Sequence, residues 1–201
     1  MVKTGGHIGG MARRSMREEI VEAALAQFHE RGFNAAAVKD ITDRAGVPKG
    51  SFYNHFESKE ALAIVALERY GNGGRLTELA DSSVEPVARI RAHFEGMRDD
   101  MISSGITRGC LLGNFGAEIV DHSEPIRAGV RAGLERWSGL LAGAIAEGQE
   151  AGGIPRELNA DQTARYLLSA WEGTLIQARA FKSAEPFESF FGITFGSLFK
   201  G

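Results

Sequence analysis

The 201-residue chain has little cysteine, little proline and no long apolar run. Its single cysteine, Cys110, cannot form a disulfide within the chain, and no apolar stretch approaches the roughly 18 residues that a membrane-spanning helix needs. Residues 1–16 are basic and rich in glycine but have no apolar segment, so they do not resemble a secretory signal. These absences favour a cytoplasmic protein that does not associate with a membrane.

An excess of basic charge is also lacking. The net charge is −3 and the sequence pI about 6.0, whereas nucleic-acid-binding domains are often basic overall. The charge is nevertheless uneven: residues 11–60 hold equal numbers of basic and acidic side chains, and residues 61–201 are acidic. With 43% hydrophobic residues the chain can bury a substantial core, so bulk electrostatics neither identifies nor excludes a DNA-binding part.

Apolar residues recur at helical spacing through most of the chain, as Ile20, Ala24 and Phe28 illustrate, and no strand-like alternation appears. Pro86 and Pro125 stand where helices can begin. The pattern predicts an all-α chain of about nine helices.

The predicted organisation has three parts along the chain. We expect a flexible arm at residues 1–14, a three-helix DNA-binding domain at residues 15–60, and a helical domain for effector binding and dimerisation at residues 61–201.

The segment ITDRAGVPKGSFYNHFESKE, residues 41–60, predicts two short helices joined by a tight turn. Ile41 lies on the apolar face of the first helix, Gly46 permits a left-handed turn, and Pro48 fixes φ where the second helix starts. Phe52 and Phe56, four residues apart, anchor the second helix inward. This arrangement is a helix-turn-helix.

In such a unit the second helix lies in the DNA major groove with its N-terminal residues at base edges. Lys49 and Ser51 are expected to contact bases, and Tyr53, His55 and Lys59 to contact phosphates. The expected DNA-binding residues are Lys49, Gly50, Ser51, Tyr53, Asn54, His55 and Lys59. The pattern alone also fits a helical corner with solvated polar residues.

Residues 17–70 resemble the N-terminal DNA-binding domain of the tetracycline-repressor (TetR) family, through AGV at 45–47, KGSFYNHF at 49–56 and SKE at 58–60. The resemblance implies an all-α homodimeric repressor of double-stranded operator DNA with a C-terminal ligand domain. Dimers place recognition helices about 34–36 Å apart, so the operator is expected to be an inverted repeat. Ala36, Ala37 and Pro48 depart from the family by lacking hydroxyl groups.

The segment RGCLLGNFGAEIVDHSEP, residues 108–125, surrounds the only thiol with glycines. Because Cys110 lies beside Arg108 and near an expected helix start, we expect a lowered thiol pKa and a partly ionised, reactive thiolate. The alternative is a buried cysteine that acts as a small hydrophobic residue.

GCLLGN at 109–114, together with residues 169–191, is similar to TetR-family repressors that respond to N-ethylmaleimide, bleach-type oxidants or acrylate. That resemblance implies that Cys110 is the sensor. The partner there is often a lysine, whereas this chain has Arg179 at the matching place and Lys182 nearby.

A second hypothesis is a pocket that binds a small effector reversibly. Its expected aromatic and sulfur-containing walls are Phe94, Met97, Phe115, Trp137 and Trp171, with Asn114, Glu118 and Arg179 as polar anchors. Arg179 would favour a carboxylate. The glycines at residues 71–75 predict a soft point or a break in the helix, through which a ligand-driven shift could reach the recognition helices.

Six of the twelve phenylalanines fall in residues 181–199, a stripe too broad for a helix that covers only its own core. We expect this helix to form a homodimer interface. The expected contact residues are Phe187, Phe191, Phe195 and Leu198. Burial within a single chain is the alternative.

Enzymatic signals are weak. The segment GNGGRL at residues 71–76 lacks the third glycine and the preceding strand of a dinucleotide site. The five histidines are scattered without metal-ligand spacing, so neither a metal nor a cofactor is expected. Cys110 has only His122 as a nearby candidate base, which leaves a cysteine hydrolase as a remote alternative. An architectural DNA protein without an effector is the other one.

Overall fold

The computed structural model describes residues 15–73 and 75–200, which form helices and contain no strand. The all-α prediction is confirmed, whereas the predicted arm at residues 1–14 lies outside the described residues. The helices are α1 (Met16–Ala35), α2 (Val38–Ala45), α3 (Lys49–Phe52), α4 (Lys59–Asn72), α5 (Arg75–Leu79), α6 (Pro86–Ser103), α7 (Leu111–Glu118), α8 (Glu124–Glu150), α9 (Ala160–Phe181) and α10 (Glu185–Ile193), which continues into the π-helical turn η1 (Thr194–Leu198).

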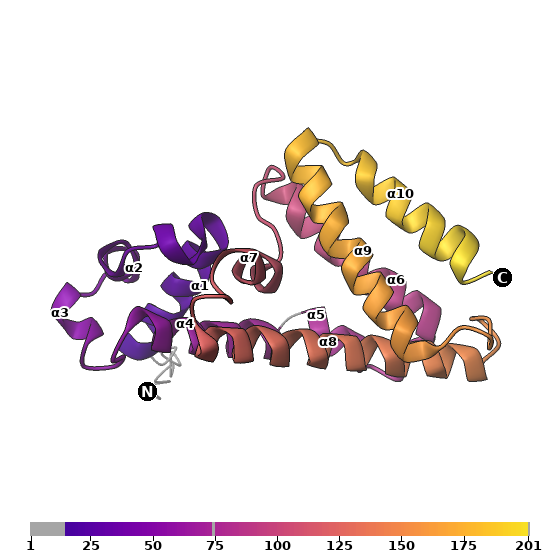
Figure 1. Ribbon diagram of the computed structural model, residues 1–201, viewed down its shortest axis with the longest axis horizontal. Helices are drawn as coiled ribbons and strands as arrows, with labels where there is room; N and C mark the ends of the chain where they lie inside the picture. The colour runs from indigo at the N-terminus through magenta and orange to yellow at the C-terminus, as the bar shows by residue number, and fades with distance from the viewer. Residues whose placement is uncertain (1–14, 74, 201) are drawn as a thin grey trace, which may run out of the picture.

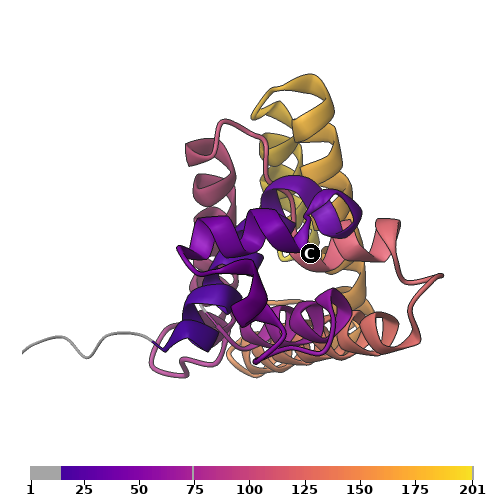
Figure 2. The same ribbon diagram turned by 90° about the vertical axis from the view of Figure 1, so that its left-hand side faces the viewer.

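Helices α1 to α4 form a compact group at one end of the molecule (Figures 1 and 2). Side-chain caps start two of them: the Ser15 hydroxyl accepts from the Glu18 N–H at the start of α1, and the Ser58 hydroxyl accepts from the Ala61 N–H at the start of α4. Apolar side chains from all four helices are fully buried together: Ile20, Phe28, Ile41, Phe52 and Leu62. These side chains hold the group together, and they belong to one hydrophobic core that continues into the C-terminal part.

The long helix α8 runs along the molecule from α4 to the far end of α9 (Figure 1). Helix α4 packs against both α1 and α8, so it belongs to the DNA-binding group and to the C-terminal part alike. The domain boundary predicted at residue 60 thus falls in the first turn of α4. Helix α4 ends at Asn72 and α5 begins at Arg75, so the break predicted at residues 71–75 is present.

The phenylalanine-rich C-terminal helix folds back along α9 and α6. Phe187 and Phe195 are buried in the chain's own core, the former against Trp171. The prediction that these two residues form a dimer contact is therefore wrong, because α10 uses them to cover the helices before it. Phe191 and Leu198 are only partly buried.

Within the described part of the chain, no helix is both long enough and apolar enough to cross a membrane.

Candidate functional site

The turn between α2 and α3 has the geometry that the sequence predicts. Gly46 adopts φ 68° and ψ 28°, in the left-handed region, and the Val47 N–H closes the end of α2 by donating to the Thr42 carbonyl at 3.0 Å. Ile41 and Phe52 are fully buried beneath the turn. Helix α2 begins after Ala37 without a side-chain cap, as the absence of a hydroxyl there implies. The result is a helix-turn-helix with a short second helix.

Six of the seven predicted DNA-binding residues gather on one outer surface around α3. Lys49, Gly50, Tyr53, Asn54 and His55 are exposed and Ser51 is half-buried. The Tyr53 ring packs edge-on against Phe52, with ring centroids 5.1 Å apart, which fixes the ring while leaving it 61% exposed.

Lys59 is placed differently from the prediction. Its ammonium donates to the Phe33 carbonyl at 2.8 Å and lies 4.4 Å from the centre of the Phe33 ring. The side chain therefore closes the end of α1 instead of extending toward DNA. Its long stem could fold back because Phe33 offers both a carbonyl acceptor and an aromatic face.

Most other basic side chains of the helix-turn-helix are neutralised by neighbours. Lys39 pairs with Asp43 on α2, and Arg44 pairs with Glu30 on α1 at 2.7 Å. Lys49 makes no ion pair within the described residues. Its charge is therefore the one on α3 that is available to DNA.

The C-terminal part contains a cavity of about 640 Å³ that reaches from α1 and α4 to α9. Of the predicted effector residues, four line it: Met97, Cys110, Trp137 and Trp171. The lining also includes residues that the sequence did not indicate, among them the ring-bearing side chains His29, Tyr70 and His93. The only sequence signal for these residues is that their rings recur at helical spacing. That spacing is equally typical of residues buried in a hydrophobic core.

Five predicted effector residues do not line the cavity: Phe94, Phe115, Asn114, Glu118 and Arg179. Phe94 is fully buried among Trp171 and Phe190, with which its ring makes contact. Arg179 donates to the Asn114 side-chain oxygen at 3.1 Å, and its guanidinium lies beside Gly109, which lines the cavity. The role of Arg179 as a carboxylate anchor stays a prediction.

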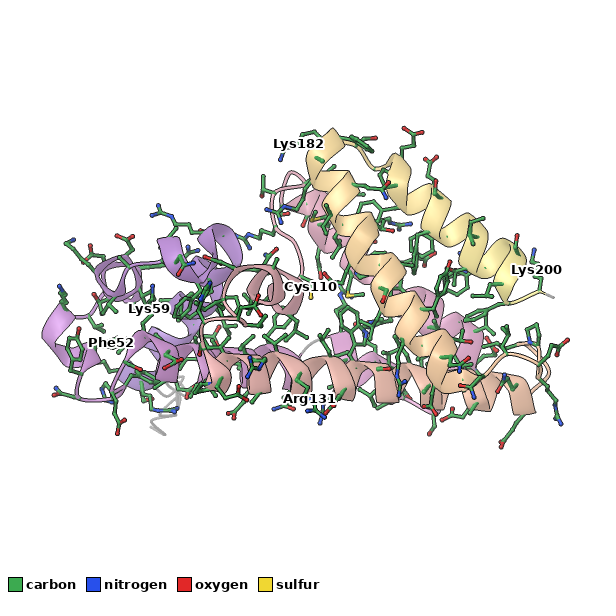
Figure 3. The ribbon with its side chains drawn as sticks, in the orientation of Figure 1. Phe52, Lys59, Cys110, Arg131, Lys182 and Lys200 are labelled. Carbon is green, nitrogen blue, oxygen red and sulfur yellow. The ribbon has the colours of Figure 1, made fainter. Side chains whose placement is uncertain are left out.

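Cys110 caps the N-terminus of α7 and lies near the centre of the molecule, beside α9 (Figure 3). It is only 5% exposed, and the Tyr70 hydroxyl lies 3.8 Å from its sulfur. Burial and the neighbouring Glu172 carboxylate raise the pKa of the thiol far above its ordinary value. The expected lowered pKa is wrong, because Arg108 turns away to Glu30 on α1, at 2.5 Å.

Glu172 on α9 is the acidic group at this thiol. Its carboxylate fills the space beside the Gly113 α-carbon, where any added Cβ would collide with it. Burial raises the pKa of this carboxyl above its ordinary value, and its Oε1 is buried without a hydrogen-bond partner. Nothing near Cys110 in the chain points to this residue, because Glu172 lies two helices later, in α9.

His93 and Trp137, which also line the cavity, form a buried polar pair. The Trp137 indole N–H donates to His93 Nε2 at 2.9 Å, and His93 Nδ1 donates to the Arg75 carbonyl at 2.8 Å at the start of α5. Burial lowers the pKa of His93 to about 4, so the ring is neutral at pH 7. A neutral ring with the proton on Nδ1 satisfies both contacts, and it fixes the junction between α4 and α5.

The segment from Arg108 to Glu118 is tied to the DNA-binding group at both ends. At its start, Arg108 shares Glu30 with Arg44 of α2. At its end, the Glu118 carboxylate accepts the Phe33 N–H at 2.8 Å and the Asn34 N–H at 2.6 Å. A displacement of α7 would therefore pull on the chain that leads into the helix-turn-helix.

Both parts of the chain match known protein families. Residues 20–66 match the family described as bacterial regulatory proteins, tetR family, and residues 86–192 match the family described as tetracyclin repressor-like, C-terminal domain. The HTH-type transcriptional repressor DhaR of Mycobacterium sp. (strain GP1) is 37% identical over 191 residues, which cover 94% of each chain.

Two solved structures show the same fold at similar identity. The regulatory protein TetR from Rhodobacter sphaeroides superposes with a TM-score of 0.83 at 31% identity, covering 92% of this chain and 98% of that one. The reduced form of NemR from E. coli superposes with a TM-score of 0.80 at 31% identity, covering 89% of this chain and 95% of that one.

Proposed function

Because this chain belongs to the TetR family of transcriptional regulators, we propose that it is a homodimeric repressor that releases an inverted-repeat operator when an electrophile or oxidant reacts with Cys110. TetR-family regulators bind operator DNA and small-molecule effectors, act as dimers and are not enzymes. The cysteine-hydrolase alternative is therefore set aside. Among the structural neighbours, NemR was solved in a form called reduced, which supports extending thiol chemistry to this chain.

One observation carries the proposal. The only thiol lines the cavity and also caps the helix whose far end, Glu118, holds the backbone at Phe33 and Asn34. Cys110 is nearly fully buried, so an adduct on its sulfur would extend into the cavity and press against the packed start of α7. Movement of α7 would then loosen the contacts that position the helix-turn-helix.

The test is operator release measured by fluorescence anisotropy on DNA from just upstream of the protein's own gene, titrated with N-ethylmaleimide. Wild type should release the DNA, whereas Cys110→Ser should bind it equally well and stay bound. Equal release by both proteins would show that the thiol is not the sensor.

If both proteins bind but neither releases, the reversible-ligand alternative gains support. One feature favours that alternative: the Trp171 indole N–H is buried without a partner in a residue that lines the cavity. A ligand with a hydrogen-bond acceptor would satisfy it.

For DNA binding, we propose the exposed surface of Lys49, Gly50, Ser51, Tyr53, Asn54 and His55. Lys49→Ala is expected to weaken operator binding about tenfold and to reduce discrimination against a scrambled operator, since a base contact by lysine is lost. Competition binding at fixed salt measures both. Lys39→Ala is the matched control, because Lys39 is already paired with Asp43; an equal loss in the two variants would contradict a specific role for Lys49.

For dimerisation, we propose the outer faces of α9 and α10, which run side by side at the end of the molecule away from α3 (Figure 1). Four large apolar side chains of these two helices are exposed: Tyr166, Ile176, Phe181 and Ile193. The exposed residues of the α10 and η1 segment from Ser189 to Ser197 carry no charge. A second copy of this chain fits such a surface.

A further inference from the structure

Two buried polar atoms near the only thiol have no hydrogen-bond partner. Glu172 Oε1 and the indole N–H of the adjacent Trp171 are both buried without hydrogen-bond partners, and Trp171 is fully buried. Unsatisfied buried polar groups are uncommon in native proteins and often mark a functional site. Trp171 and Cys110 line the same cavity, so the unpartnered indole N–H and the thiol border a space that a ligand can occupy.

The Tyr70 hydroxyl donates to the Cys110 sulfur across 3.8 Å. The Glu172 carboxylate lies against Gly113, in the first turn of the helix that Cys110 precedes, and its charge acts on the thiol. The other charged groups nearby are engaged elsewhere: Arg108 with Glu30, and Arg179 with Asn114.

Other potential bases are also occupied or distant. His29 bonds through Nε2 to the Gly109 carbonyl, and the Lys182 ammonium donates to the Ile106 carbonyl at 2.9 Å, at the end of α9 away from Cys110 (Figure 3). The base that faces the thiol within the described residues is therefore Glu172.

We propose that Glu172 is the proton acceptor through which Cys110 reacts with α,β-unsaturated carbonyl compounds. This inference rests on the proposed function and adds the group that makes a buried, protonated thiol reactive. Without such a group the thiol would react only through its small thiolate fraction.

The step is an addition with no net oxidation. The Cys110 S–H proton passes to the Glu172 carboxylate while the sulfur electron pair forms a bond to the β-carbon of the unsaturated compound. The carbon–carbon π pair moves onto the carbonyl as an enolate. Glu172 then returns the proton to the α-carbon, which leaves a thioether and restores the carboxylate.

Glu172 could act as a proton acceptor or only as a neighbouring charge, and these two roles predict opposite changes in the alkylation rate of Cys110 when Glu172 is replaced. As a mere neighbour, its negative charge raises the pKa of the Cys110 thiol, so removing the charge would increase the thiolate fraction and speed alkylation. As the proton acceptor, its removal slows alkylation. Glu172→Gln keeps the size of the side chain and removes the charge.

The experiment measures the rate of N-ethylmaleimide addition to the full-length protein without DNA, by intact mass, from pH 6 to pH 8. We expect Glu172→Gln to react about 100-fold more slowly than wild type at pH 7, a general-base contribution at the low end of the usual range. Its rate should rise about tenfold per pH unit, following the thiolate alone. The wild-type rate should level off once Glu172 is ionised.

Glu172→Asp keeps the carboxylate on a shorter stem and should retain the flatter pH profile at an intermediate rate, which covers the case in which the glutamine variant folds poorly. Glu188→Gln removes an exposed carboxylate on α10 and should match wild type. A rate for folded Glu172→Gln equal to or above wild type overturns the inference, even if Cys110-dependent operator release stands. Absence of any Cys110 adduct in wild type overturns both proposals.

Discussion

Gly32→Ala is expected to lower the free energy of unfolding by about 3 kcal/mol. Gly32 interrupts α1 with φ 77° and ψ 178°, a conformation that only glycine adopts without strain. An alanine Cβ would also collide with Glu118 Oε2, the atom that accepts the Phe33 N–H. The substitution therefore adds backbone strain and displaces a carboxylate from two amide donors. Urea unfolding measures the loss.

The matched control is Gly152→Ala. Gly152 has φ +79°, close to the φ of Gly32, but a Cβ there would meet nothing within 4 Å. This variant should cost about 1 kcal/mol, the ordinary price of a left-handed alanine. Equal losses at the two positions would show that the contact between Glu118 and the end of α1 contributes little. Gly32→Ala should in addition blunt N-ethylmaleimide-driven operator release, since it displaces Glu118.

Ile176→Glu is expected to convert the dimer to a monomer and to weaken operator binding by at least about 100-fold. Two linked recognition units bind an inverted repeat far more tightly than one, by about 10²–10⁴, and this gain is lost when the units separate. The substitution places a charge on the proposed α9 and α10 interface. If the dimer still formed, this charge would be buried between the two copies without a partner, which is costly. Light scattering after size exclusion gives the mass, and anisotropy gives the affinity.

Val84→Glu is the control, because Val84 is also exposed and apolar, at 41%, but lies in the loop before α6. It should remain dimeric and bind operator as wild type does. A dimer that survives Ile176→Glu with unchanged affinity would place the interface on another face of the chain.

The helix-turn-helix was the part of the fold that the sequence predicted best, because it depends on local patterns. Gly46 and Pro48 define a turn through backbone angles that few other residues adopt, and apolar spacing shows which way Phe52 points. These signals act within a few residues, so the helix-turn-helix was visible without the rest of the chain. The direction of Lys59 was not visible, because a long flexible stem can reach solvent or fold back on Phe33 with equally ordinary geometry.

The chemistry of the thiol was mispredicted because electrostatics depends on neighbours in space. Arg108 is close to Cys110 in sequence but pairs with Glu30, whereas Glu172 reaches the thiol from α9. The prediction that Phe187 and Phe195 form dimer contacts was wrong for a related reason. A broad stripe shows that a helix is covered on several sides, but not whether its own chain or a second copy covers it, and Phe187 packs on Trp171 of the same chain.

The position of the two tryptophans gives the protein a built-in optical signal. The chain has only two, Trp137 and Trp171, and both line the cavity that contains its only thiol. All of its indole emission therefore comes from residues that line this cavity, and a thiol-directed dye or quencher has a single site of attachment in the same cavity. Occupancy of the cavity can be followed in unlabelled protein, in real time and in mixtures with DNA, without a reporter introduced elsewhere.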